Sequence, residues 1–481
     1  MLAPPFTDHA VLQRDVALPV WGQASPGEKI TVRFRGQERT TSATPDGRWS
    51  VRLDPIPANA EGADLVVSGT STVTLHDIVM GEVWLVSGQS NMDRPLNLAG
   101  DGKAAAAAAN STLVRHLKVE QSPSDLPADT VRTSGWRTAT PKTAGDFSAV
   151  GYFFAQAMAE KLKVPIGIIN SSWGGTPIES WLTKSELKKS SAWPRFDAEW
   201  QAALKEFPQK LAEYPTLDVA WRKADDAALA AGKRNLLPWP HPPVGPGTAY
   251  APGGLFNGMI LPLAPYALRG VLLYQGESNI DQPVEYRELF PAMIRSWRAA
   301  WPQGDFPFFF VQIPNYADGE PNGRKWAALR EAQESALKLP ATAMAVTIDV
   351  GDPDDIHPKN KRPVGERLAL IALHQIHDQR ALEWTGPTVQ SVQPAGTAIR
   401  VKFTHADGLT SHTKPVAGFE VAGADKVFHS ATARIEGDSV LVSAAGVSAP
   451  IAVRYAWTNS PAVSLYNGAG LPAGPFRTDD W

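Results

Sequence analysis

The chain has 481 residues and contains no cysteine. This absence excludes disulfide bonds, thiolate catalysis and zinc–thiolate sites together, although it does not fix the compartment. The sequence also lacks an apolar stretch long enough to span a bilayer. Its net charge of -3 gives neither a basic surface for nucleic acid nor a polybasic membrane patch. We therefore expect no nucleic acid and no membrane among its partners.

Other signals are missing as well. The first six residues lack the basic start and apolar segment of a signal peptide. We expect an exported protein, periplasmic or extracellular, whose signal peptide is absent from this sequence. No Gly-x-Ser-x-Gly elbow, phosphate-binding loop or well-placed dinucleotide fingerprint occurs. These absences favour hydrolysis without a cofactor, and nothing in the sequence indicates an oligomeric state.

Three regions follow one another along the chain. Residues 1–80 contain short alternating strands and turns, which are typical of a small β-sandwich. Residues 81–382 alternate apolar strands with segments of helical spacing, which predicts an α/β domain with a mostly parallel, doubly wound sheet. Residues 383–481 return to short strands and predict a second β-rich domain.

A long segment at residues 183–255 interrupts the alternation of strands and helices. It contains an amphipathic helical part, 193–231, followed by a tract rich in proline and glycine, 238–254. Insertions of this length in α/β enzymes often cover a site, but a surface excursion without a function is equally compatible with the sequence.

Four apolar strands of the middle region each run directly into a polar or glycine-rich loop. Ligands collect at the carboxyl ends of strands in open α/β sheets, so these loops are the candidate site. The loops contain Gly88-Gln89-Ser90, Trp173-Gly174-Gly175-Thr176, Gln275-Gly276-Glu277-Ser278-Asn279, and Asp349 to His357.

Acyl transfer requires a nucleophile, a base, a group that orients the base, and donors for the oxyanion. Ser90 is the candidate nucleophile and His357 the candidate base. Asp354 lies three residues before His357, where one turn of loop could hold its carboxylate near the imidazole. Backbone N–H groups of Gly174 and Gly175 and the side chain of Asn279 are candidate oxyanion donors.

Simpler interpretations exist for each part. The glycine pair is most simply a tight turn, and Glu277 is most simply a buried hydrogen-bonding acid. A metal site at Asp352, Asp354, Asp355 and His357 is a minor alternative, because no second histidine is clustered with them. Most of the 16 tryptophans are expected in packing, with a few as walls on which sugars stack.

The ordered motifs resemble the sialate O-acetylesterase type of carbohydrate esterase in the SGNH (GDSL-like) hydrolase superfamily. The resemblance covers nearly the whole chain. It is carried by Gly81 to Met92, Asn170 to Trp181, Leu255 to Met259, Tyr274 to Asn279 and Asp349 to Pro358, and extends to Val11-Leu-Gln-Arg14, Pro19-Val-Trp-Gly22, Leu465-Tyr-Asn-Gly468 and Pro475 to Asp479.

The resemblance implies a flavodoxin-like three-layer α/β/α core that removes acetyl groups from sugar hydroxyls. From the strand pattern we expect β-sandwich-type flanking regions, and from the missing motifs we expect no cofactor and no metal. The resemblance also implies that Ser90 is the nucleophile and His357 the base. Asp354, from the Asp-x-x-His pattern, ranks narrowly before Glu277 as the orienting acid. The remaining roles are oxyanion donors at Ser90, Asn279 and one of Gly174 and Gly175, and substrate-binding residues at Gln89 and Gln275.

The sequence therefore predicts a carbohydrate O-acetylesterase that works through an acetyl-Ser90 intermediate. The acetylated sugar is a sialic acid or a hemicellulose such as xylan or xyloglucan, and the motifs do not separate these. The alternative is a catalytically weak carbohydrate-binding protein on the same fold. A peptidase or lipase ranks lower, because no feature points to an apolar acyl chain.

Overall fold

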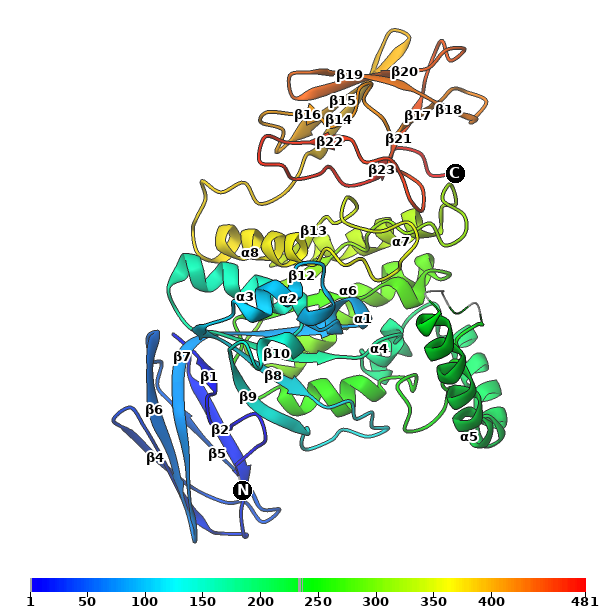
Figure 1. Ribbon diagram of the computed structural model, residues 1–481. Coiled ribbons are helices and arrows are strands. Elements are labelled where there is room, and N and C mark those ends of the chain that lie inside the picture. The colour runs from blue at the N-terminus through cyan, green and yellow to red at the C-terminus, as the bar shows by residue number, and fades with distance from the viewer. Residues whose placement is uncertain (1, 232–234, 236) are drawn as a thin grey trace.

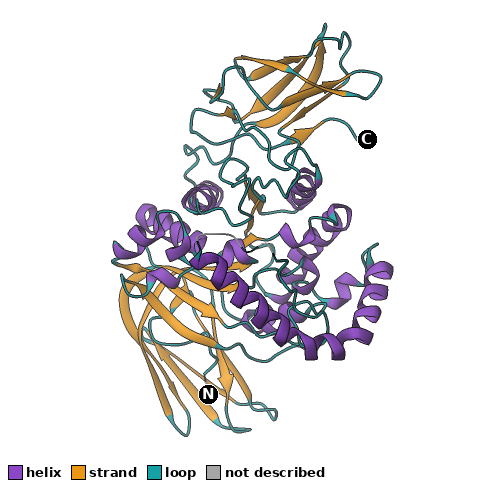
Figure 2. Ribbon diagram, turned by 45° about the vertical axis from the view of Figure 1, so that its right-hand side comes forward, coloured by secondary structure: helices purple, strands orange, loops and turns teal. Residues whose placement is uncertain are grey.

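The computed structural model describes residues 2–231, 235 and 237–481. Figure 1 shows an α/β core in the middle of the molecule, with the first strands at one end and the last strands at the other. Figure 2 shows the same division, with helices around the core and strands gathered at both ends. The chain is thus an α/β protein with additional β-structure on either side.

A mixed sheet forms the core. Its neighbouring strands are parallel except for the last pair, which is antiparallel. The order is β13 (Thr342–Ala345), β12 (Phe308–Val311), β11 (Gly270–Tyr274), β7 (Thr72–Gly88), β10 (Ile166–Ser172), β8 (Ser111–Val119) and β9 (Thr133–Ala139).

Strand β7 lies in the centre of this sheet, and all its residues from 78 to 88 are buried. Its side chains alternate between two apolar cores. Val83 and Leu85 belong to one core, and Trp84 and Val86 belong to the other. A continuous apolar run of this kind is expected where a parallel strand is covered on both faces.

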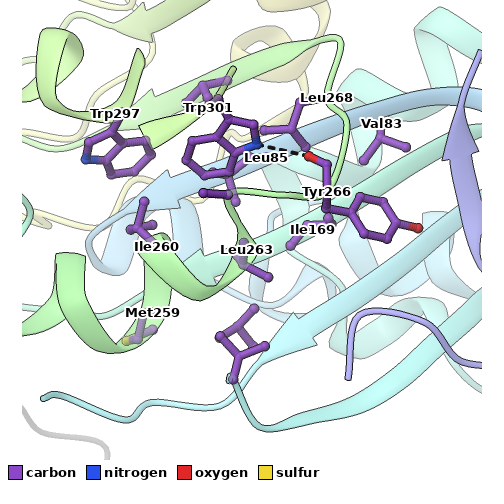
Figure 3. Close-up of a cluster of buried hydrophobic side chains, with 14 of the residues drawn as sticks. Val83, Leu85, Ile169, Met259, Ile260, Leu263, Tyr266, Leu268, Trp297 and Trp301 are labelled. Atoms are coloured by element: carbon purple, nitrogen blue, oxygen red, sulfur yellow. Dashed lines mark hydrogen bonds between the residues drawn. The ribbon is translucent and has the colours of Figure 1, made fainter. Parts of the chain in front are cut away.

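Helices cover both faces of the sheet, as the alternating pattern predicted. The core around Trp84 is closed by α3 (Ala149–Leu162) and α8 (Arg362–Ile376). The core around Val83 is closed by α6 (Pro283–Ala300) and α7 (Lys325–Gln333). Figure 3 shows this second core, where the indole N–H of Trp301 donates to the Tyr266 carbonyl at 2.9 Å.

The N-terminal strands are continuous with the core through β7. That strand is 17 residues long and crosses residue 80, where the sequence predicted a domain boundary. Its first half pairs with β6 and β1, so the two regions share one strand. The other elements of this end are β1 (Val11–Gln13), β2 (Leu18–Gln23), β3 (Lys29–Phe34), β4 (Gln37–Ser42), β5 (Arg48–Leu53) and β6 (Asn59–Ser68).

The C-terminal strands form small antiparallel sheets around a third apolar core. They confirm the predicted return to β-structure, while a sandwich arrangement at either end stays a prediction. The strands are β14 (Thr388–Ala395), β15 (Ala398–Thr404), β16 (Thr410–Ser411), β17 (Phe419–Ala422), β18 (Phe428–Ser430), β19 (Thr432–Glu436), β20 (Ser439–Ser443), β21 (Ala452–Tyr455), β22 (Leu465–Tyr466) and β23 (Phe476–Arg477).

The segment between β10 and β11 contains the long helix α5 (Trp193–Ala230). None of the described helices combines the length and the apolar character that crossing a membrane requires. Shorter helical elements are α1 (Ser90–Asp93), α2 (Gly102–Ala107), α4 (Lys184–Leu187), the π-helical turn Phe256–Ile260, and 3₁₀ turns at Leu96–Leu98, Ala144–Asp146, Ile178–Ser180, Leu261–Leu263, Glu277–Asn279 and Glu334–Lys338.

Candidate active site

Ser90 lies at the carboxyl end of the central strand because the chain turns sharply at Gly88. The φ angle of Gly88 is +128°, which side chains rarely tolerate, and a Cβ atom there would lie 2.0 Å from the Tyr274 carbonyl oxygen. The next residue, Gln89, donates its N–H to the same carbonyl at 3.0 Å. This close approach of β7 to β11 places Ser90 as the first residue of α1.

His357 is brought to Ser90 from the loop that follows β13. Its Nε2 atom lies 2.8 Å from the Ser90 Oγ atom, although the two residues are 267 positions apart. Burial, followed by the positive charge of Arg94, lowers the pKa of His357. The imidazole is therefore neutral near pH 7, and a ring that carries its proton on Nδ1 can accept the hydroxyl proton at Nε2.

Among the described residues, Asp355 has the carboxylate nearest to the far nitrogen of the imidazole. Its Oδ1 atom lies 4.0 Å from His357 Nδ1, and the same oxygen accepts the His357 backbone N–H at 2.8 Å. Within the described part of the chain, Asp354 makes no hydrogen bond or ion pair with His357. Its backbone N–H donates to Asp352 Oδ1 at 2.9 Å. The structure thus places Asp355, rather than the predicted Asp354, beside the candidate base His357.

Glu277 lies beneath the nucleophile turn and has no hydrogen bond or ion pair with the His357 ring in the described structure. Its Oε1 atom accepts from Asn91 Nδ2 at 2.6 Å, and its Oε2 atom is buried without a partner. Asn91 Nδ2 also donates to the Ile356 carbonyl at 3.0 Å, and Asn91 Oδ1 accepts from Lys361 Nζ at 2.5 Å. The Asn91 side-chain amide therefore connects the Ser90 turn to the loop after β11 and to the loop that contains His357.

Burial dominates the protonation of this network. Desolvation raises the pKa of Glu277, partly offset by its hydrogen bonds and by Lys361. Desolvation likewise lowers the pKa of Lys361 to about 7. The two shifts favour a protonated Glu277 carboxyl and an unprotonated Lys361 amine, because a buried charge without full compensation is costly.

The two glycines of the predicted oxyanion turn face different neighbours. A Cβ atom on Gly174 would lie 3.2 Å from the Ser90 Cβ atom, whereas one on Gly175 would lie 3.6 Å from the Tyr250 hydroxyl and 3.9 Å from the Trp239 ring. Within the described residues, the Gly174 N–H donates no hydrogen bond to the protein. Gly174 is therefore the glycine beside Ser90, the candidate nucleophile.

Asn279 is held firmly by its neighbours. Its Oδ1 atom accepts from the Ile178 N–H and from Gln275 Nε2, both at 2.9 Å, and its Nδ2 atom donates to Glu179 Oε2 at 3.0 Å. An amide nitrogen carries two hydrogens, so one N–H of Asn279 remains for a further acceptor.

The two glutamines predicted to bind substrate are buried. Gln89 Oε1 accepts from the N–H groups of Gly276 and Ser278 at 3.3 Å each. Gln275 accepts from the Tyr286 hydroxyl at 2.8 Å while its Nε2 atom donates to Asn279. These contacts hold the loop after β11 in place; a direct contact with substrate stays a prediction.

Sequence reasoning assigned no role to Asn91 or Lys361 and considered Asp355 only as a possible metal ligand. Asn91 directly follows Ser90 within the motif Gly81 to Met92, and this position was the one indication in the sequence that Asn91 belongs to the site. The indication for Lys361 was weak, because its position just before α8 does not show that its side chain is buried. No group of three or more His, Asp or Glu residues in the described part of the chain is arranged to hold a metal ion.

Comparison with known proteins identifies the class to which this site belongs. The chain is a member of the carbohydrate esterase family of sialic acid-specific acetylesterases, whose family model matches residues 80–210 and 255–374. These two ranges contain Ser90, Gly174, Asn279 and His357, and they leave out residues 211–254 of the insertion.

Individual relatives extend the likeness over the full length. The chain is 28% identical to sialate O-acetylesterase from Mus musculus, over 98% of this chain and 92% of the mouse protein. It is also 28% identical to the Homo sapiens sialate O-acetylesterase, over 98% of this chain and 91% of the relative. The crystal structure of a carbohydrate acetylesterase from Xanthomonas citri superimposes with a TM-score of 0.85 at 39% identity, covering 100% of both chains.

Proposed function

We propose that this chain is a carbohydrate O-acetylesterase that releases acetate from O-acetylated sugars through an acetyl-Ser90 intermediate. The observation that carries the proposal is the 2.8 Å contact between Ser90 Oγ and His357 Nε2 at the carboxyl end of the central strand. Membership of a carbohydrate esterase family and full-length likeness to acetylesterases support the choice of acetyl ester.

In the first half-reaction, Ser90 Oγ attacks the acetyl carbonyl carbon while His357 Nε2 takes the hydroxyl proton. The negative charge that develops on the carbonyl oxygen is stabilised by N–H donors from Ser90, Gly174 and Asn279. The tetrahedral intermediate collapses as the ester C–O bond breaks, and the imidazolium gives its proton to the departing sugar oxygen. An acetyl group then remains on Ser90.

In the second half-reaction, His357 takes a proton from water as the water oxygen attacks the acetyl carbon. The same donors stabilise the second tetrahedral intermediate. Its collapse breaks the bond to Ser90 Oγ, which recovers a proton from His357, and acetic acid leaves. Neither half-reaction requires a metal or an organic cofactor.

For the acid that supports the imidazolium, we propose Asp355. The support is its position 4.0 Å from His357 Nδ1 and its hydrogen bond to the backbone of the same residue. Asp354 remains the alternative from the Asp-x-x-His pattern, with Glu277 as a third candidate. We also propose that the core is of the flavodoxin-like SGNH type, and export from the cell stays a prediction.

Release of acetate from a panel of acetylated hemicellulose oligosaccharides and acetylated sialosides tests the proposed function. The wild-type protein should deacetylate at least one class, and Ser90→Ala should abolish that activity together with hydrolysis of 4-nitrophenyl acetate. A carbohydrate-binding protein on the same fold would instead bind sugars equally well with Ser90 or alanine and release no acetate.

A further inference from the structure

Trp239 lies on the outer side of the oxyanion turn and comes from the long insertion. Gly175 has a φ of +74°, and a Cβ atom there would meet the six-membered ring of Trp239 at 3.9 Å and 4.0 Å. The preceding residue, Gly174, faces Ser90. A two-residue turn thus has the nucleophile on one side and an indole on the other.

The tract that carries Trp239 is tied to its surroundings at several points. The indole N–H of Trp221, on α5, donates to the Leu237 carbonyl at 3.0 Å. Gly245 packs so closely on Phe207 that a Cβ atom there would lie 2.2 Å from the ring, and the Gly247 N–H donates to Asp125 Oδ1 at 3.1 Å. These contacts attach the tract that carries Trp239 to α5 and to the loop that contains Asp125.

Trp239 also keeps a substantial exposed surface. The residue is 38% exposed, which is unusual for so large an apolar group. The His241 ring packs against it edge to face, with the ring centroids 5.0 Å apart and the planes at 69°. A solvent-exposed indole beside Ser90 suits the apolar face of a sugar ring. The sugar can stack on the indole while its hydroxyl groups stay in water.

A cavity lies along α5, and the two residues that follow Trp239, Pro240 and His241, line it. Its volume is about 640 Å³, and it lies between the helix and the Pro240–Val244 tract, with His241 in its wall. The charged residues in the wall are Glu199, Glu206, Glu213 and Lys210. Among these described residues the cation is Lys210, and its ammonium group pairs with Glu206 at 2.6 Å. The wall therefore offers acceptors for sugar hydroxyls but no unpaired cation for an acidic sugar.

We infer that Trp239 is a stacking platform for a neutral sugar unit next to the acetylated one, and that the cavity along α5 accommodates further units. This inference rests on the proposed esterase function and names its substrate class as an acetylated neutral oligosaccharide or polysaccharide. Trp239 lies between residues 211 and 254, which the family model does not match.

The test compares Trp239→Ala and Trp239→Phe with the wild-type protein on three substrates: acetylated xylotetraose, acetylated xylose and 4-nitrophenyl acetate. Trp239→Ala should lower kcat/KM for the tetrasaccharide about tenfold more than for either small substrate, mainly through KM. Trp239→Phe should retain most of the activity, because it keeps an aromatic face. Trp481→Ala is the matched control, since that tryptophan is 41% exposed but lies at the C-terminus.

Each other outcome overturns the inference. Equal losses on all three substrates would mean that Trp239 only supports the Gly175 turn, and no loss on the tetrasaccharide would mean that it contacts no sugar. The wild-type protein is also assayed with an acetylated sialoside as a fourth substrate, and a faster reaction with it than with acetylated xylotetraose would reject the neutral substrate class. Failure of the proposed function is distinguishable, because the wild-type protein would then release no acetate from any acetylated sugar, whatever the effect of Trp239→Ala.

Discussion

Replacing Asp355 with asparagine should lower kcat/KM about tenfold. The Asp355 carboxylate lies 4.0 Å from His357 Nδ1, and its side chain is 41% exposed. Unit charges 4 Å apart interact by about 1 kcal/mol in water and about 4 kcal/mol at an effective dielectric constant near 20. A half-exposed pair belongs near the lower value, and 1.4 kcal/mol of lost imidazolium stabilisation corresponds to a factor of about ten.

The substitution keeps the loop intact and changes mainly the charge, because the amide oxygen of asparagine can still accept the His357 backbone N–H. It should also change the pH dependence. Asp355 raises the pKa of His357 against the opposing effects of burial and of Arg94. Removing its charge lowers that pKa further, so the acidic limb of kcat/KM should move to lower pH. Stopped-flow hydrolysis of 4-nitrophenyl acetate across a pH series measures both effects.

Asp354→Asn is the matched control. It removes the same charge from the preceding residue, whose side chain makes no bond to the imidazole in the described structure. We expect it to change neither kcat/KM nor the acidic limb appreciably. If Asp354→Asn instead costs about ten thousandfold, as when a tightly hydrogen-bonded triad acid becomes an amide, the Asp-x-x-His pattern has identified the acid and our geometric reasoning is wrong. A comparable loss in Glu277→Gln would transfer the role to Glu277.

Four further predictions concern the rest of the site. Ser90→Ala and His357→Ala should each lower kcat by about a millionfold, and the double variant should be hardly slower; multiplicative losses would show that they do not act as one unit. Asn279→Ala should lower kcat by about a hundredfold to a thousandfold with little change in KM, so an effect mainly on KM would contradict an oxyanion role. Lys361→Met should lower the free energy of unfolding, measured with urea, by about 1–3 kcal/mol, because it removes the buried donor to Asn91 Oδ1; an unchanged midpoint and slope would refute this. Prolonged treatment with EDTA should leave activity intact, and a loss that added divalent metal restores would reject the metal-free mechanism.

The sequence was sufficient to predict that Ser90 and His357 lie at the same site, and the structure brings them to 2.8 Å of each other. Ser90 and His357 each follow an apolar strand, and parallel strands bring their carboxyl ends to one edge of a sheet. Periodicity also predicted the helices that flank the sheet, because a helix must turn an apolar face toward its core. These features depend on local patterns and on topology rules, both of which the order of residues contains.

The sequence alone could not predict which of two adjacent residues faces the site. Asp354 and Asp355 have the same chemistry and differ by one residue, so only the path of an irregular loop decides which carboxylate approaches the imidazole. The choice between Gly174 and Gly175 depends likewise on the direction in which a tight turn faces. Strand spacing could not show that β7 crosses residue 80, because a long strand shared by two sheets has no composition change at the crossing point.

The contacts between distant segments were equally hidden. Lys361 is buried against Asn91, 270 residues earlier in the chain, and a lysine in a polar loop is ordinarily expected in solvent. Trp239 lies beside Gly175 although the whole of α5 separates the two residues in the sequence. Such pairings result from tertiary packing, which no local propensity encodes.

The central claim is that acetyl transfer passes through Ser90, and partition of the acetyl group between water and methanol tests it directly. With a fixed methanol concentration, the ratio of methyl acetate to acetate is measured for 4-nitrophenyl acetate and for an acetylated xylo-oligosaccharide. A shared acetyl-Ser90 intermediate predicts the same ratio for both substrates, and loss of both products in Ser90→Ala. A ratio that changes with the leaving group, or products that persist without the Ser90 hydroxyl, would contradict the account.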